Sequence, residues 1–197
     1  VDSLKLEGNL NGELSVIQKD GTYFPISSIL IDQISINDVD YGDLDLNFQG
    51  NNDLTYYDII ATLTHENVKS IDAVGSIDVS PTRPKLNLNV DLNDFNLMAI
   101  SPFGGDVITD IRGLISGSAQ ITGDLQSPDV LGNFVLKDSG LKVPYLEIDF
   151  DLNDRTNLIA TKNKLEILPT QITDTKYNTQ GTLTGNATHQ SFNDWRL

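Results

Sequence analysis

The chain has 197 residues, no cysteine and a formal net charge of −15. Its 13 Lys and Arg residues make it a poor partner for nucleic acid, whose phosphates bind basic side chains, and for anionic lipid head groups. The lack of cysteine excludes disulfides, thiol catalysis and thiolate metal sites.

The N-terminal stretch Leu4–Val16 has an apolar residue or glycine at every even position. This period-two alternation predicts a β-strand with one dry face and one wet face. The glycines within Gly8–Gly12 predict a bend or bulge, which leaves open whether the stretch forms one strand or two. Lys19–Gly21 predicts a hairpin turn. The apolar phase then slips by one residue between Ile31 and Ile34, which predicts another bulge or a corner.

The same alternation continues to the C-terminus, with polar turns about every ten residues. It predicts an all-β chain of roughly a dozen strands, elongated because each strand mainly contacts its neighbours in sequence. Helix is expected only as one or two turns near Leu97–Ser101 and Val107–Ile111. Further strands are expected around 44–48, 57–63, 71–79, 86–92, 115–125, 130–136, 146–152, 158–160, 165–168 and 181–187.

Both ends of the chain fall within this pattern. No stretch approaches about 18 consecutive apolar residues, the length of a membrane-spanning helix. The first residues resemble neither a signal peptide nor a basic leader. We therefore expect residues 1–197 to be a single elongated segment of a longer protein.

Three stretches carry a family resemblance: Ile111–Pro128, Leu131–Leu136 and Gly140–Leu146. In order and spacing they resemble the C-terminal region of the TamB proteins, which belong to the AsmA-like group of Gram-negative envelope proteins. Asn93–Leu97 and Asp174–Leu183 look like the form found in Bacteroidetes. The resemblance covers about residues 86–197, and the preceding part of the chain follows the alternation alone.

The resemblance implies an elongated, curved, antiparallel-rich β-sheet of taco shape, with an apolar concave face that forms a groove. It also implies a periplasmic location in a protein held in the inner membrane by an N-terminal helix, an anchor that this chain does not contain. Members of the family are implicated in phospholipid transport to the outer membrane. They are also implicated, with an outer-membrane β-barrel partner, in the assembly of outer-membrane proteins.

The dry face of the strands is the candidate site. An apolar face could bind phospholipid acyl chains, because each CH₂ removed from water gains about 0.8 kcal/mol. It could equally be the core of a β-sandwich in a surface or adhesin domain, or belong to a scaffold that pairs its sheet edge with nascent outer-membrane strands. The predicted lining residues are Leu86, Leu88, Val90, Leu92, Ile115, Ala119, Ile121, Phe134, Leu136, Val143, Ile148 and Phe150.

Other chemistry is not favoured. His65 and His189 stand beside turn residues without metal-ligand spacing, so we predict solvent-facing turns and no metal. The Asp38–Asp45 stretch lacks the spacing and terminal Glu of a calcium loop, and a solvated turn is predicted there. Nucleophile elbows and phosphate-binding loops are absent, and no carboxylate pair is singled out as catalytic. We expect a non-enzymatic chain without a cofactor.

Overall fold

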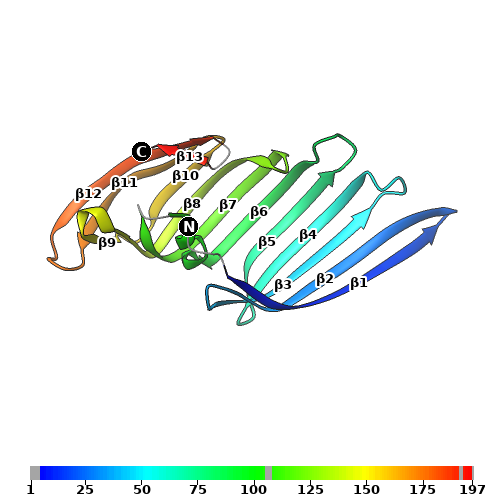
Figure 1. Ribbon diagram of the computed structural model, residues 1–197, viewed down its shortest axis with the longest axis horizontal. Coiled ribbons are helices and arrows are strands. Elements are labelled where there is room, and N and C mark those ends of the chain that lie inside the picture. Colours follow the sequence, from blue (N-terminus) through cyan, green and yellow to red (C-terminus); the bar gives the residue numbers. More distant parts are fainter. Residues whose placement is uncertain (1–4, 105–107, 191–192, 197) are drawn as a thin grey trace.

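The computed structural model describes residues 5–104, 108–190 and 193–196. Within them the chain is almost entirely β-structure, arranged as one 13-stranded antiparallel sheet with two short 3-10 helices (Figure 1). The predicted all-β, elongated and curved sheet is therefore confirmed. The strands are β1 (Leu6–Lys19), β2 (Thr22–Ile36), β3 (Val39–Gly50), β4 (Tyr56–His65), β5 (Val68–Asp78), β6 (Lys85–Asn96), β7 (Thr109–Asp124), β8 (Ser127–Val143), β9 (Ile148–Leu152), β10 (Thr156–Thr161), β11 (Lys164–Asp174), β12 (Gln180–Gln190) and β13 (Asn193–Arg196), and the helices are η1 (Leu97–Gly104) and η2 (Pro144–Leu146).

Strands that follow one another in sequence are neighbours in the sheet, from β1 to β8 and then from β10 to β13. Short turns enforce this order. The β2–β3 turn, for example, is Asn37 and Asp38, with φ of 51° and 65°. Two-residue turns with positive φ match the twist of antiparallel strands, and Asn and Asp tolerate that conformation. Only β9 departs from the order among the described strands, because it pairs with both β8 and β11.

The pairing register joins the dry sides of the strands into one face. Residues that lie directly opposite each other in antiparallel strands point to the same side of the sheet. Leu88 of β6, for example, pairs with Gly75 of β5 and with Ile121 of β7. The wet sides merge in the same way on the opposite face. One apolar row crosses the strands from β3 to β10 through Leu46, Ala61, Ala73, Val90, Ala119, Gly132 and Ala160.

Helix η1 packs on the apolar face near one end of the strands. Ala99 of η1 shares a buried cluster with Tyr41 of β3 and Leu63 of β4. Leu97 of η1 shares a second cluster with Ile115 of β7 and Leu136 of β8. Strands as far apart as β3 and β8 thus pack around one short helix, because the sheet curves with its apolar face on the concave side.

The predicted irregularities of the first two strands are confirmed. β1 is a single strand, and its register with β2 shifts at a bulge between Glu7 and Asn9. The slip in apolar phase in β2 corresponds to a register shift against β3 between Ile31 and Ile34. The extra residue lets both apolar pairs face the same side of the sheet despite their odd spacing.

The predicted helix over Val107–Ile111 is wrong. The chain is already in strand β7 at Thr109, and Val107 lies outside the described residues. Asp110 has a φ of 51°, and the register with β8 shifts beside it, so a bulge hides the period-two pattern here. The structure instead places a second helical turn at η2, which begins with Pro144, a residue suited to the first helical position.

Candidate functional site: an open apolar face

Most of the predicted lining residues lie together on the concave apolar face. Val90 pairs with Ala119, and Ile115 pairs with Leu136. The register therefore brings residues from different parts of the sequence into adjacent rows. The residues gathered in this way are Leu86, Leu88, Val90 and Leu92 of β6, Ile115, Ala119 and Ile121 of β7, and Phe134 and Leu136 of β8.

The other three predicted residues lie at the hairpin of β8 and β9. Val143 pairs with Ile148, and all three side chains, including that of Phe150, are half-buried. Because β9 lies off the main strand order, these residues belong to the apolar face only while β9 stays bound to β8 and β11. They form a side branch of the site rather than part of its central rows.

Arg112 of β7 holds β9 in this position. Its Nη2 lies 2.8 Å from Oδ1 of Asp149 and 2.6 Å from Oδ1 of Asp151. It also donates a 3.0 Å hydrogen bond to the carbonyl oxygen of Phe150. Burial lowers the pKa of Arg112, but the hydrogen bonds and charges of the two carboxylates outweigh it and raise the pKa. The guanidinium therefore stays charged and ties the branch to the main sheet.

The centre of the apolar face is only partly shielded from water. Leu88, Val90 and Ile121 are each half-buried, and no large side chain of the described residues is fully buried. A β-sandwich would cover such residues with a second sheet. The described strands all belong to one sheet, so this part of the chain supplies no second sheet to cover the face. The face is an apolar surface that solvent reaches.

The η1 end of the face is closed. Tyr41 is 3% exposed, and its ring lies 5.4 Å from that of Phe95. Burial raises the pKa of the Tyr41 hydroxyl, and the backbone of Ala99 offsets part of this rise. Tyr41 and Phe95 thus fix η1 against the strands. The apolar face has a packed end under η1 and an open middle.

The apolar face extends beyond the residues that the sequence singled out. Leu46 of β3 pairs with Ala61 of β4, and Ala61 pairs with Ala73 of β5. Leu158 and Ala160 of β10 continue the face on the other side of β8. The same period-two alternation is present in all these strands and could have identified them.

The two histidines occupy different environments. His65 ends β4 and is half-buried. His189 is 4% exposed and lies within β12, where its backbone N–H donates a 2.9 Å hydrogen bond to Asn163. The prediction of a solvent-facing turn is therefore wrong for His189, because β12 continues past it. Across residues 5–104, 108–190 and 193–196, no three His, Cys, Asp or Glu residues gather as metal ligands would.

The carboxylates of the Asp38–Asp45 stretch serve the local backbone. Oδ1 of Asp40 accepts a 2.8 Å hydrogen bond from the N–H of Gly42. Oδ1 of Asp43 accepts a 2.9 Å hydrogen bond from the N–H of Gln33, at the bulge of β2. The predicted solvated turn is wrong beyond Asp38, because β3 begins at Val39 and both carboxylates lie within that strand.

No protein-family model, curated protein or solved structure matches this chain. The resemblance to the TamB proteins, the periplasmic location and the lack of enzymatic activity therefore stay predictions. The helices of the described segments are too short to cross a membrane.

Proposed function

We propose that this chain is a non-enzymatic conduit segment that carries phospholipid acyl chains on its apolar face between the inner and outer membranes. The observation that carries the proposal is the open middle of that face. A row of apolar residues crosses the sheet from Leu46 to Ala160 without a polar side chain. The neighbouring residues Leu88 and Ile121 are half-buried and still contact water.

The energetics favour an acyl chain as the occupant. An acyl tail of sixteen carbons gains on the order of 10 kcal/mol when it leaves water, at about 0.8 kcal/mol per CH₂. The exposed part of the apolar face gains in the same way when the tail covers it. Neither gain requires a specific polar contact, so a tail can slide along the face while it stays out of water.

The proposal is tested at Ile121, in the open middle of β7. Ile121→Asp places a carboxylate among the apolar residues Leu88 and Val130, with which Ile121 pairs. Water reaches this position, so the variant should remain folded by circular dichroism. Lipid that co-purifies with the protein, measured by extraction and mass spectrometry, should fall sharply. A photo-crosslinking side chain placed at position 121, with the rest of the sequence unchanged, should capture lipid.

Asn87→Asp is the matched control. It adds the same charge on the wet face, beside Leu88, and should leave both fold and lipid content unchanged. A folded Ile121→Asp variant with undiminished lipid would show that the face is not the lipid path. An unfolded variant would show that Ile121 belongs to a closed core, which would remove the proposed site.

A second candidate function is favoured by β1. All 14 residues of this strand are exposed, including Leu10 (69%) and Leu14 (73%). An exposed apolar edge strand is a template for another strand, as the assembly of outer-membrane β-barrel proteins would require. If β1 has this scaffold function, a synthetic outer-membrane strand should crosslink to β1. Leu10→Lys combined with Leu14→Lys should abolish the crosslink. If that pair blocks assembly while Ile121→Asp does not, the scaffold function replaces the conduit.

A further inference from the structure

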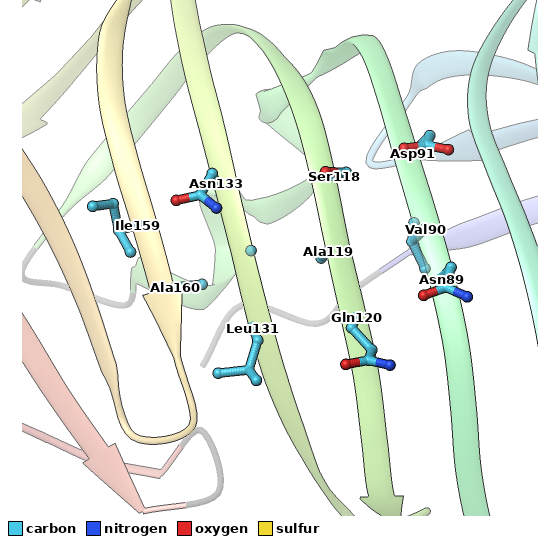
Figure 2. Close-up of a pocket in the computed structure, with 11 residues that line it drawn as sticks. Asn89, Val90, Asp91, Ser118, Ala119, Gln120, Leu131, Asn133, Ile159 and Ala160 are labelled. Atoms are coloured by element: carbon cyan, nitrogen blue, oxygen red, sulfur yellow. The ribbon is translucent and has the colours of Figure 1, made fainter.

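A shallow depression of about 600 Å³ lies over β6, β7, β8 and β10 (Figure 2). It opens on the wet face, opposite the apolar one. A Cβ atom added to Gly132 would meet the ring of Phe134 at 2.7 Å, so Phe134 covers the apolar side of Gly132. Gly132 borders the depression and Phe134 does not. The residues on its two sides are Asn89, Asp91, Ser118, Gln120, Leu131, Asn133 and Ile159. Val90, Ala119, Gly132 and Ala160 lie between them along the strands and also border the depression.

These side chains form two parallel rows. Ser118 pairs with both Asp91 and Asn133 in one row, and Gln120 pairs with Asn89 in the other. The rows are two residues apart along each strand, or about 7 Å, and together they cross four strands over about 14 Å. The depression is therefore a narrow trough with polar groups on both sides.

The polar groups of the trough are not used by the protein itself. Asn89, Gln120 and Asn133 make no side-chain hydrogen bond to any described residue, whereas two polar groups beside the trough, those of Ser116 and Asp129, do. On one side Oγ of Ser116 donates a 3.0 Å hydrogen bond to Asp94. On the other side Asp129 forms a 2.8 Å ion pair with Lys162. The trough thus gathers three amide side chains whose donors and acceptors are free to bind a ligand.

We propose that this trough binds a neutral saccharide chain. Each side-chain amide offers both a donor and an acceptor, which matches the adjacent hydroxyl groups of a sugar ring. The carboxylate of Asp91 can accept two further hydroxyl hydrogen bonds. Leu131, which is 50% exposed, and Ile159 provide an apolar wall for the C–H face of a ring. The net charge of −15 disfavours anionic sugars.

This second site does not depend on the proposed lipid function, because it lies on the opposite face of a single-layered sheet. A saccharide could bind while an acyl chain occupies the concave face. Loss of one ligand would leave the other in place, so the two proposals fail separately.

The proposal is tested by NMR titration of the 197-residue chain with two probes, a glucose tetramer and an N-acetylglucosamine tetramer. At least one probe should shift the backbone amide signals of residues 89–91, 118–120 and 131–133. Asn89→Ala combined with Gln120→Ala should weaken that binding about tenfold, because two hydrogen-bonding groups are lost. Ser118→Tyr should abolish binding by filling the trough.

Asn87→Ala is the control, because Asn87 lies on the same strand and face but outside the trough. It should bind the probe as the unchanged chain does. The proposal is overturned if neither tetramer shifts the trough signals at millimolar concentration. It is also overturned if the double variant, folded by circular dichroism, binds as tightly as the unchanged chain.

Discussion

Because one end of the apolar face is packed and its middle is open, the same substitution at two positions of β7 should lower the free energy of unfolding by different amounts. Ile115 is 8% exposed and packs in one cluster with Leu97 and Leu136. Ile115→Ala removes buried carbons and leaves a cavity under η1, because the helix and strands cannot fully collapse around it. We expect it to destabilise the protein by about 3–4 kcal/mol, within the usual range for such core truncations.

Ile121→Ala should cost much less. Ile121 lies on the same strand and face but is only half-buried, so the truncation removes carbons that already contact water in part. Solvent fills the space, and no cavity term is added. We expect a loss of about 1 kcal/mol, close to the transfer free energy of the carbons that are shielded.

The assay is urea unfolding of both variants, followed by circular dichroism, with the free energies of unfolding compared with that of the unchanged chain. Equal losses for the two variants would refute the distinction between a packed end and an open middle. A large loss for Ile121→Ala in particular would mean that another part of the protein covers the centre of the face, and the proposed lipid path would then be closed.

Three further predictions concern other parts of the sheet. Burial raises the pKa of Tyr41 above its usual value of about 10. The stability that the protonated hydroxyl contributes is therefore present below about pH 10 and is lost as the pH rises through the raised pKa. In Tyr41→Phe the urea midpoint of unfolding should fall less at alkaline pH than in the unchanged chain. Arg112→Met should speed amide hydrogen exchange in β9 by an amount equivalent to about 1–2 kcal/mol and leave exchange in β5 unchanged. Equal exchange of β9 in the variant and in the unchanged chain would show that Arg112 does not hold β9 in place. Gly75→Ala should lower the melting temperature strongly, because the new Cβ would overlap the backbone of β6. Gly185→Ala should not lower it, because no atom lies within 4 Å of the new Cβ. Similar melting temperatures for the two variants would contradict the close approach of β5 and β6.

The sequence predicted the sheet well because its signals are local. Period-two alternation depends on which side of a strand faces water, and a two-residue turn such as Asn37–Asp38 fixes the register of the next strand. Even the bulge between Ile31 and Ile34 could be read, since it leaves a phase slip in the apolar residues. A neighbour-paired sheet therefore needs little information from distant parts of the chain.

The features that the sequence could not predict depend on distant contacts. The packing of Ala99 against Tyr41 joins residues 58 positions apart, and no periodicity encodes it. The β9 branch likewise depends on Arg112 meeting Asp149 and Asp151. Nor could alternation distinguish an open face from the interior of a sandwich, because both require the same one-sided pattern.

The neighbour-to-neighbour order of the strands makes the span of this sheet adjustable in fixed steps. Each strand adds about 4.8 Å across the sheet, so duplication of one hairpin would lengthen it by roughly 10 Å. A hairpin returns the chain to its original direction and keeps the dry sides of the strands aligned, whereas a single added strand would reverse the direction of everything after it. Relatives of this chain should therefore differ in length by whole hairpins, and the length of such a sheet would be set by how many hairpins its gene has copied.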